Sequence, residues 1–421
     1  MRILHTSDWH LGQNFFNKNR RSEHQAFLNW LLNTAKENDV NAIIVAGDIF
    51  DTSTPPSYAR ELYNQFVVEA NKLDCQLILL GGNHDSVSVL NESKNLLKYL
   101  RADVVANASG EDKDQVVSIL DSDGQVGALV CAIPFIRPQD VMSSQSGVKA
   151  TEKQQQLGEA IKAHYHKLYL EAQSQQAELE SQLGKKVPII ATGHLTALGV
   201  TQSESVRDIY IGTLEGFASD AFPPADYIAL GHIHRPQIVG KKENIRYSGS
   251  PIPLSFDELK SNKQVVMVEF ENTTPNINPI AVPNFQPMAS LKGDLHSIEE
   301  QLAEFKQSEQ TIWLSIEVSE QDFLSDLQQR IAEMVKGLNV EVLQLRRART
   351  SAKQAIEQKK LKPLLSYNRR TCSSVDSSLK PSLASKRRLV LSVFLLPLAR
   401  YSIRLSLRVR SSSNEDPIFR I

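Results

Sequence analysis

The sequence predicts a layered α/β fold, and two observations on about its first 280 residues support this prediction. Short apolar runs alternate with longer amphipathic stretches, as strands alternate with helices in such folds. Five of the apolar runs end in a cluster of Asp, Asn or His side chains. Ligands of layered α/β folds lie outside the carboxyl ends of the strands, so we expect the five clusters to meet at one edge.

The five strand-like runs are short, and they cover residues 2–6, 42–46, 77–80, 189–191 and 227–230. The polar side chains that follow them, in the same order, are Asp8 and His10, Asp48, Asn83, His194, and His232 with His234. A glycine directly precedes four of these residues, and because glycine has no Cβ the chain can turn sharply there. We therefore expect tight turns that present the seven side chains together.

These seven side chains form a mixed set of oxygen and nitrogen donors. They offer carboxylates, one amide oxygen and four imidazoles, which suits Mn²⁺, Fe²⁺ or Zn²⁺ better than Ca²⁺ or Mg²⁺ alone. Seven ligands are too many for one ion, so we expect two divalent ions about 3.5–4 Å apart that share one carboxylate. Such a pair would activate water and neutralise a phosphoryl group, which predicts hydrolysis of a phosphate ester.

An ordinary structural role is the alternative for each motif. A lone Asp-x-His or His-x-His pair is more often a packing or surface feature, since strand alternation puts both residues on one face. The joint order DxH, GD, GNHD, GH and GHxH, each at the exit of a strand-like run, favours the metal site over this alternative.

Length and composition limit what the rest of the chain can be. With 421 residues and 41% hydrophobic content, two or three packed domains are expected. The three cysteines are widely spaced without a CxxC motif, which argues against a disulfide framework or a thiolate zinc site, so we expect Cys75 and Cys131 in the core and Cys372 in the tail. The N-terminus lacks a secretory signal and the apolar run 389–398 is too short to span a membrane, so a cytoplasmic location without membrane contact is expected.

The charge is unevenly distributed along the chain. Residues 364–421 hold 11 of the 47 basic and 3 of the 48 acidic residues, which leaves 36 basic and 45 acidic residues before them. A protein that bound nucleic acid mainly through its overall charge would show the opposite sign. Any DNA must therefore be held by local patches, by metals or by a partner.

The ordered motifs resemble the calcineurin-like metallophosphoesterase superfamily, whose fold is a two-sheet β-sandwich flanked by helices. The resemblance implies that Asp48 bridges two ions, that one ion takes Asp8, His10 and His234, and that the other takes Asn83, His194 and His232. It also implies that His84 contacts the phosphate and assists the leaving group. Asp85 is a second catalytic candidate that would orient His84, and a turn or cap role is its alternative.

Flanking segments resemble one branch of the superfamily, the SbcD nucleases: these segments are residues 6–12, 47–57, 206–217, 229–236 and 247–258. Protein Ser/Thr phosphatases would instead carry an Arg soon after the GD motif and a Glu after Gly-Asn-His. Asp51 departs from the archaeal and eukaryotic members, which carry a His there, and this leaves His84 as the principal candidate for leaving-group chemistry. The resemblance implies a Mn²⁺-dependent 3′→5′ exonuclease on double-stranded DNA that also cuts single strands and hairpins as an endonuclease.

The same resemblance implies partners and a domain order. The partners are an SbcC-type coiled-coil ATPase and a second copy of the nuclease, as a homodimer within a heterotetramer. Residues 1–283 would form the nuclease domain, 284–350 a small α/β capping domain, and 351–421 a linker and tail. Candidate DNA contacts are Tyr247, Ser248, Arg346, Arg347 and Arg349, and a solvated strand end is the alternative for the arginines.

Four further segments carry structural predictions. The capping domain should follow the order helix 297–306, strand 311–318, helix 321–337 and strand 340–346. Residues 151–186 read as a long solvated helix. The helical segments 57–73 and 87–100 carry apolar residues that suit either a two-fold dimer contact or the core of one subunit, namely Leu62, Phe66, Leu90, Leu96 and Leu97.

From about Leu364 the composition changes to Ser, Arg and Leu and the resemblance ends, which suggests a shifted reading frame and a non-native, disordered tail. An intact frame on sequencing the locus would contradict this hypothesis.

Two other functions compete with the nuclease interpretation. A metallophosphoesterase acting on nucleotides or small phosphodiesters would lack the long segment 247–258 and the second domain. A non-catalytic scaffold of the same fold would be expected to have lost one or more ligands, and all seven are present.

Overall fold

The computed structural model describes residues 1–142, 149–207, 216–319 and 326–348. Arg349, Cys372 and the tail 351–421 therefore lie outside the described residues. Two six-stranded sheets dominate the described part of the chain, with strand orders β14-β13-β1-β4-β5-β6 and β11-β12-β10-β9-β8-β7. This arrangement, with helices outside the sheets, confirms the predicted α/β class and the two-sheet sandwich.

The first sheet mixes parallel and antiparallel neighbours, and its strands are β1 (Arg2–Thr6), β4 (Ala42–Val45), β5 (Gln76–Leu80), β6 (Ala102–Val105), β13 (Gln264–Glu271) and β14 (Thr274–Ala281). The second sheet comprises β7 (Val116–Leu120), β8 (Val126–Cys131), β9 (Ile189–His194), β10 (Tyr227–Gly231), β11 (Gln237–Val239) and β12 (Lys242–Tyr247). Short elements complete this region: β2 (Asn14–Phe15), β3 (Lys18–Asn19), α5 (Pro138–Val141), and the 3-10 turns η1 (Asp112–Gln115) and η2 (Phe256–Lys260).

The central strands are buried on both faces, which explains why they read as continuous apolar runs. Ile44 and Ile78 from the first sheet pack against Val130 and Ile190 from the second, between the sheets. The alternate residues of β4 and β5 pack instead against helices on the outer face. Because both faces of these strands are packed, the register of each strand is fixed, and so is the position of the loop that follows it.

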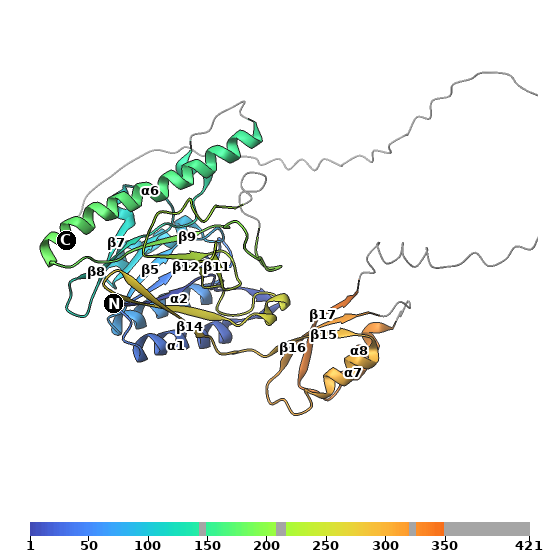
Figure 1. The fold of residues 1–421 in the computed structure, drawn as a ribbon. Helices are drawn as coiled ribbons and strands as arrows, with labels where there is room; N and C mark the ends of the chain where they lie inside the picture. The colour runs from blue at the N-terminus through green and yellow to red at the C-terminus, as the bar shows by residue number, and fades with distance from the viewer. Residues whose placement is uncertain (143–148, 208–215, 320–325, 349–421) are drawn as a thin grey trace, which may run out of the picture. The chain divides into compact units, whose positions relative to one another are not determined.

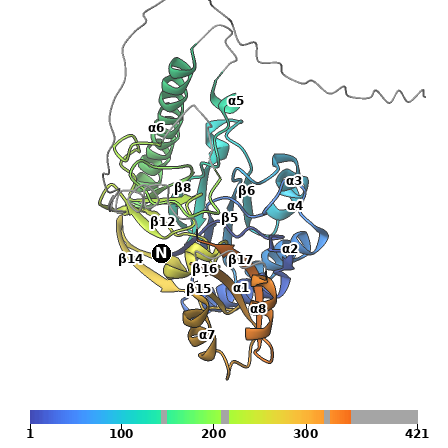
Figure 2. The ribbon, with the colours of Figure 1, turned by 90° about the vertical axis from the view of Figure 1, so that its right-hand side faces the viewer.

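Helices α1 (Arg21–Glu37) and α2 (Ser57–Lys72) cover the first sheet, while α6 (Ala150–Leu183) covers the second (Figures 1 and 2). Residues 151–186 were expected to be a solvated helix, and that expectation is wrong for one face. Leu157, Ile161, Tyr165 and Leu168 are all buried at spacings of three and four residues, so they form a stripe packed on the sheet.

The segment 87–100 is two short helices, α3 (Val87–Glu92) and α4 (Lys94–Lys98), where one was predicted. The apolar residues named as dimer or core candidates are almost all in the core of the subunit: Leu62, Phe66, Leu90 and Leu97 are each at most 3% exposed. Leu96 is the exception, with 64% of its surface exposed, and the neighbouring Tyr99 is 85% exposed. A dimer contact stays a prediction for Leu96.

The second region follows the order β15 (Met288–Gly293), α7 (Leu295–Ala303), β16 (Ile312–Val318), α8 (Leu327–Met334) and β17 (Val340–Arg347). The predicted order lacked the first strand, because the sequence MASLKG contains only one fully apolar buried position, Leu291. The three strands form a parallel sheet in the order β15-β16-β17, with its own core beneath α7 and α8. Trp313 of β16 stacks on Phe15 at 5.8 Å between ring centroids.

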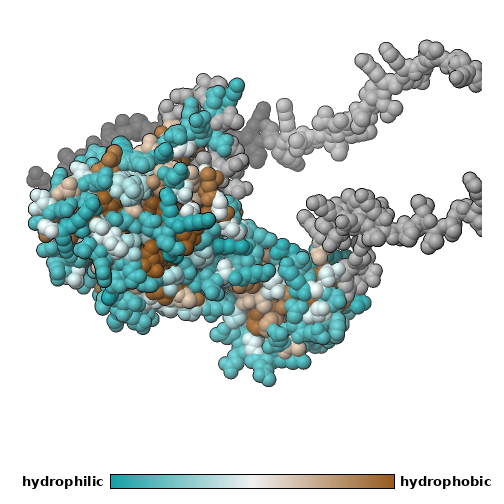
Figure 3. Space-filling model, in the orientation of Figure 1, coloured by the Kyte–Doolittle hydropathy of each residue, from teal (hydrophilic) through white to brown (hydrophobic). Residues whose placement is uncertain are grey.

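Cys75 and Cys131 are free and buried, as predicted from their spacing. Figure 3 shows a face on which hydrophilic residues cover most of the described surface and hydrophobic residues form small patches. Within the described ranges, none of the helices combines the length and apolar character needed to span a membrane.

Candidate metal centre

The carboxyl ends of five strands bring the seven predicted ligands together. Strands β1, β4 and β5 are parallel neighbours in the first sheet, and β9 and β10 are parallel neighbours in the second. Among the described residues, three groups of His and Asp have ligand atoms within 4.8 Å of one another: Asp8, His10 and His234; His10, Asp48 and His84; and Asp48, His194 and His232. The site thus spans both sheets.

The turns that hold these residues have unusual backbone conformations. Asp8, His10, Asp48 and His232 all have positive φ, at 54°, 48°, 51° and 93°. Non-glycine residues rarely adopt this region, and such strain concentrates at functional sites where the surrounding structure compensates for it. Hydrogen bonds from Asp8 N to Gly47 O and from His10 N to Asp48 O, both 3.0 Å, join the first two loops.

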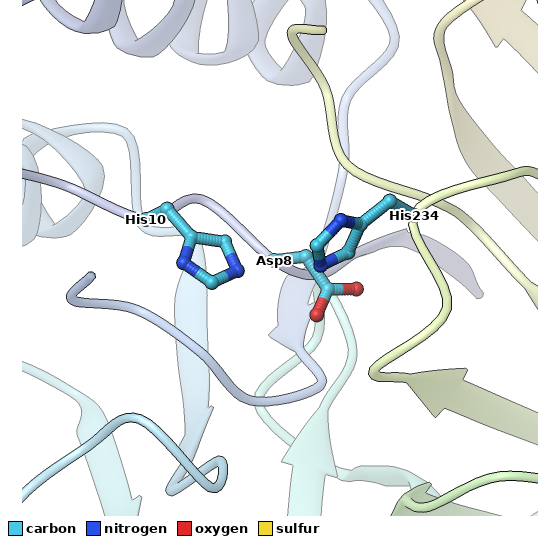
Figure 4. Close-up of side chains that lie close together, drawn as sticks. All are labelled: Asp8, His10 and His234. Atoms are coloured by element: carbon cyan, nitrogen blue, oxygen red, sulfur yellow. The ribbon is translucent and has the colours of Figure 1, made fainter. Parts of the chain in front are cut away.

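Asp8, His10 and His234 form the first group, and Figure 4 shows the three side chains close together. The backbone N–H of His232 donates to both carboxylate oxygens of Asp8, at 3.0 and 3.1 Å. His10 Nδ1 lies 3.1 Å from Asp51 Oδ1, while its Nε2 is buried and has no hydrogen-bond partner among the described residues. His10 therefore directs an unused nitrogen into the group, as a metal ligand would.

In the second group, a neutral His194 ring would place a nitrogen lone pair opposite two oxygen acceptors. His194 Nδ1 lies 2.9 Å from the carbonyl oxygen of Ala46, so this nitrogen must carry a proton and Nε2 is left as the acceptor of the neutral ring. Yet Nε2 lies 2.9 Å from Asn83 Oδ1 and 3.3 Å from Asp48 Oδ2, and both of these are acceptors. Ligand atoms bonded to one ion at about 2.1 Å lie about 3 Å apart, so these separations fit a cation between them.

Asp48 lies between the two groups. Its Oδ2 is 3.6 Å from His10 Nε2 and 3.3 Å from His194 Nε2, and its Oδ1 accepts a 2.9 Å hydrogen bond from the backbone of His84. Gly82 packs directly on Asp48, where an added Cβ would collide with the carboxylate and the backbone nitrogen. One carboxylate oxygen is therefore fixed by the backbone, and the other lies between His10 Nε2 and His194 Nε2.

The buried carboxylates Asp48 and Asp8 favour positive charge in the site. Burial would lower the pKa of His194, but Asp48 and Asp8 outweigh burial and raise the pKa to about 9. Burial would raise the pKa of Asp48, but the neighbouring His194, His10 and His84 hold it well below its usual value. Burial lowers the pKa of His232 well below 6.5, and His194 adds to this effect, so the ring is neutral and has a lone pair that could bind a metal ion.

His84 lies beside the first group, with its ring centroid 4.6 Å from that of His10. Its Nδ1 is 2.7 Å from the carbonyl oxygen of Asp51, so Nδ1 donates there and Nε2 is the nitrogen left for a substrate. Burial lowers the pKa of His84, and the positive field of His10 acts in the same direction.

Asp85 does not orient His84, and its prediction as a catalytic residue needs correction. Its carboxylate accepts backbone N–H groups from Gly82, Ile49 and Phe50, at 2.8, 3.1 and 2.9 Å. These bonds tie the loop after β5 to the loop after β4, so the turn role is the one that the structure supports. Burial and the neighbouring Asp48 raise the pKa of Asp85 to about 6.

Tyr247 and Ser248, predicted as DNA contacts, are in the interior, and this prediction is corrected. The Tyr247 hydroxyl donates to Leu195 O at 2.7 Å and accepts from Ala197 N at 2.9 Å, and the side chain has no exposed surface. Ser248 is equally buried, 2.9 Å from Ser7 Oγ.

Arg346 and Arg347 are exposed at the end of β17, where a DNA contact stays a prediction. Arg346 lies 3.8 Å from Glu204 and also contacts Gln344. Arg349 lies outside the described residues.

Two residues that contact predicted ligands were not identified as site residues from the sequence: Asp51 and Glu258. Asp51 was noted only as a departure from relatives, yet its carboxylate contacts His10, and its place three residues after Asp48 is the signal that could have identified it. Glu258 lies 3.3 Å from His234 Nδ1 and is fully buried. Its spacing from the other motifs carries no signal, because only the fold brings η2 to the centre.

Comparison with known proteins agrees with this geometry. The model of the calcineurin-like phosphoesterase family matches residues 1–236, and a second family model, described as a type 5 capsule protein repressor C-terminal domain, matches residues 284–367. The chain is 52% identical over 353 residues to the SbcD subunit of the nuclease SbcCD of Escherichia coli (strain K12), covering 83% of this chain and 86% of that protein.

More distant relatives carry the same description. The SbcD subunit of the nuclease SbcCD of Rhodobacter capsulatus is 36% identical, covering 64% of this chain and 66% of that protein, and the Bacillus subtilis protein is 29% identical, covering 77% and 81%. The family model matches more than half of the chain, and the Escherichia coli protein is 52% identical over 86% of its own length, so the two comparisons agree. The chain therefore belongs to the calcineurin-like phosphoesterase family and, within it, to the SbcD subunits of the SbcCD nucleases.

Proposed function

We propose that this protein is the nuclease subunit of an SbcCD-type complex and hydrolyses phosphodiester bonds in DNA at a centre of two divalent metal ions. The observation that carries the proposal is the position of His194 Nε2, which faces the acceptor oxygens of Asn83 and Asp48. A neutral His194 ring would oppose its Nε2 lone pair to these oxygens, and a positive charge between them removes that repulsion. Because Asp48 and Asp8 raise the pKa of His194 to about 9, a proton on Nε2 supplies this charge in the metal-free protein, and a divalent ion bound there would replace it. The similarity to proteins described as nucleases supports DNA as the substrate.

We assign the ligands by the two groups in which they lie, with Asp48 between them. Asp8, His10 and His234 would hold one ion, and Asn83, His194 and His232 would hold the other. The chemistry that such ions supply when bound is activation of water and neutralisation of phosphoryl charge. The mixed nitrogen and oxygen donor set favours Mn²⁺ as the physiological metal.

The chain's own residues would orient the substrate and handle the proton. The Asp51 carbonyl accepts from His84 Nδ1, which leaves Nε2 for the substrate. The imidazolium form of the ring, protonated on both nitrogens, would donate a hydrogen bond or a proton from Nε2 to the departing oxygen. Asp85 keeps the loops of Asp48 and Asn83 in register through its three backbone contacts. We infer 3′→5′ exonuclease action on double-stranded ends and endonuclease action on single strands and hairpins.

The proposal extends to partners and organisation. We infer an SbcC-type coiled-coil ATPase as partner, a homodimer of this chain within a heterotetramer, and a cytoplasmic location. The candidate DNA contacts that remain lie in the proposed capping region 284–350: they are the exposed Arg346 and Arg347, and Arg349, which lies outside the described residues. Residues 1–283 would form the nuclease domain. The relatives are each named as one subunit of a nuclease, which supports a complex of several subunits.

The test is degradation of an end-labelled DNA duplex with and without Mn²⁺, comparing the unchanged protein with His84→Gln and Asp48→Ala. We expect both variants to lose cleavage by about 10²-fold or more, while His84→Gln still binds two ions and Asp48→Ala does not. Cleavage of bis(p-nitrophenyl) phosphate without cleavage of any DNA would favour a small-phosphodiester hydrolase. Failure to bind metal would favour a non-catalytic scaffold.

A further inference from the structure

We propose that Glu258 is a positioning residue that fixes the orientation and the tautomer of His234, and thereby sets the affinity of one of the two metal positions. The proposal rests on the metal centre proposed above and goes beyond it to a residue outside the seven ligands. It follows from the contacts behind His234, on the side of the ring away from Asp8 and His10.

His234 has one nitrogen for the centre and one for the protein interior. Its Nδ1 lies 2.6 Å from Ser205 Oγ and 3.3 Å from Glu258 Oε1. A carboxylate can only accept, so the proton of the neutral ring belongs on Nδ1 and the lone pair on Nε2. Nε2 is the atom left to join Asp8 and His10 (Figure 4), and a carboxylate behind a metal-bound histidine is the arrangement that fixes such rings.

Glu258 is itself held from every side, which gives it a fixed position. Oε1 accepts hydroxyl hydrogen bonds from Ser203, at 2.8 Å, and from Ser205, while the Ser255 hydroxyl lies 3.2 Å away and has a shorter contact, 2.5 Å, with Asp257. Oε2 accepts from the backbone N–H of Leu254 at 3.0 Å and from Lys263 Nζ at 2.5 Å. The residue is fully buried, so this carboxylate is not exchanging these partners for water.

Lys263 extends the same support to the main chain of His234. Its ammonium group lies 2.5 Å from Glu258 Oε2 and 3.1 Å from the carbonyl oxygen of His234. The buried Glu258–Lys263 pair therefore contacts both the ring and the backbone of a single ligand. A buried ion pair often adds little to stability, because the cost of removing both charges from water offsets their attraction. We therefore interpret the contacts of this pair with His234 as a means of positioning that residue.

An amide at position 258 would test this role through the hydrogen-bond pattern. In Glu258→Gln, the two donors on the Oε2 side, Leu254 N–H and Lys263, require the amide oxygen there. The amide NH₂ then takes the place of Oε1 beside Ser205 and His234 Nδ1, where a donor replaces an acceptor. This exchange favours the tautomer that accepts at Nδ1 and carries the ring proton on Nε2, the atom left for the metal. A residue of purely structural importance would not move this proton.

The experiment measures Mn²⁺ binding to the full-length protein, by electron paramagnetic resonance of the free ion, and the tautomer of His234 in the metal-free protein, by ¹⁵N imidazole shifts. The matched control is Glu23→Gln, which changes another buried carboxylate, paired with Arg20 at 2.6 Å instead of with a histidine. The resonance of His234 is assigned by its absence in His234→Gln.

We expect Glu258→Gln to weaken one of the two Mn²⁺ sites by about 10–100-fold, to leave the other unchanged, and to move the His234 proton to Nε2. Glu23→Gln should keep both affinities and the original tautomer. Unchanged Mn²⁺ affinities in Glu258→Gln, or weakening without a change of tautomer, would overturn the positioning role. If the unchanged protein binds no pair of Mn²⁺ ions, the proposed metal centre itself fails, so the two failures are distinct.

Discussion

At the scale of single residues, the centre depends on close contacts that leave no space for a larger side chain. Gly82 is the clearest case, because a Cβ added there would meet both the carboxylate and the backbone nitrogen of Asp48. Backbone atoms cannot rotate away as a flexible side chain can. The Asp48 carboxylate would have to move, and with it the geometry of both proposed ion positions.

We predict that Gly82→Ala prevents the protein from binding a pair of metal ions at the Asp48 carboxylate. We also expect it to lower the free energy of unfolding by about 1–3 kcal/mol, the usual cost of overpacking. Mn²⁺ titration and urea unfolding measure the two effects. Gly124→Ala is the control, because an added Cβ there meets no atom within 4 Å and only the positive φ of 74° adds strain. Normal metal binding by Gly82→Ala would show that Asp48 can shift without loss of the bridge.

His5 provides a prediction on pH. It is fully buried, 3.0 Å from the Tyr227 hydroxyl and 3.2 Å from Leu230 O, and burial lowers its pKa to about 3. The unfolded chain has the ordinary pKa of about 6.5, so the stability from neutral His5 is complete above that pH and is lost as the pH falls toward 3. The expected loss is about 1.4 kcal/mol per pH unit within this window.

The check is urea unfolding between pH 7 and pH 5 with a chelator present, so that metal release does not contribute. We expect His5→Gln, which keeps a donor and an acceptor, to be less stable at pH 7 but to have a flatter pH dependence. If the free energy of unfolding fell equally steeply with pH in both proteins, protonation of His5 would not be the cause of the loss of stability.

At the scale of elements, α6 (Ala150–Leu183) shows how one stripe of residues fixes a helix to a sheet. We predict that Ile161→Ala, at a fully buried position of the stripe, lowers the free energy of unfolding by about 2–5 kcal/mol. Leu170→Ala on the same helix, where 64% of the leucine is exposed, should change it by less than about 0.5 kcal/mol. Equal effects in denaturant unfolding would contradict the packing described for α6.

The element α4 (Lys94–Lys98) carries the prediction about the dimer. Leu97 faces the core at 3% exposure, whereas Leu96 is 64% exposed beside the exposed Tyr99. We expect Leu96→Glu to convert a dimer into monomers in analytical ultracentrifugation without loss of metal binding, because a charge would be buried in an apolar contact. A Leu96→Glu protein with an unchanged sedimentation coefficient would place the dimer contact elsewhere.

At the scale of the whole molecule, ion binding and folding are linked because the ligands come from both sheets. Bound metal stabilises the native state by RT ln(1 + [L]/Kd), which is about 2.7 kcal/mol per site at 100-fold excess over Kd. We predict that a chelator lowers the unfolding temperature, that Mn²⁺ restores it, and that Asp48→Ala removes this response. Calorimetry with and without Mn²⁺ measures it, and a metal-independent transition would contradict the linkage.

The sequence predicted which side chains lie together at the edge of the sheets, because each follows a strand-like run and the fold class determines where such runs end. The prediction that Tyr247 contacts DNA was wrong because the similarity of a segment does not show which of its side chains are buried. The burial of Tyr247 follows from the pairing of β12 with β10 and from the contact with the loop at Ala197. Glu258 was not predictable, since it is distant in sequence from every ligand except His234 and its partners are serines without a motif. The apolar residues of α6 do recur at helical spacing, but the many Gln and Glu residues between them led to the prediction that the whole helix is solvated.

The spread of the ligands along the chain has a consequence for synthesis. Asp8 leaves the ribosome early, while His232 and His234 follow only after β10 (Tyr227–Gly231) has been made. The first sheet also waits for β13 (Gln264–Glu271), which pairs with β1. A nascent chain therefore carries an incomplete centre until most of the first 271 residues have emerged, so the hydrolytic site matures late and cannot act from a partly made protein.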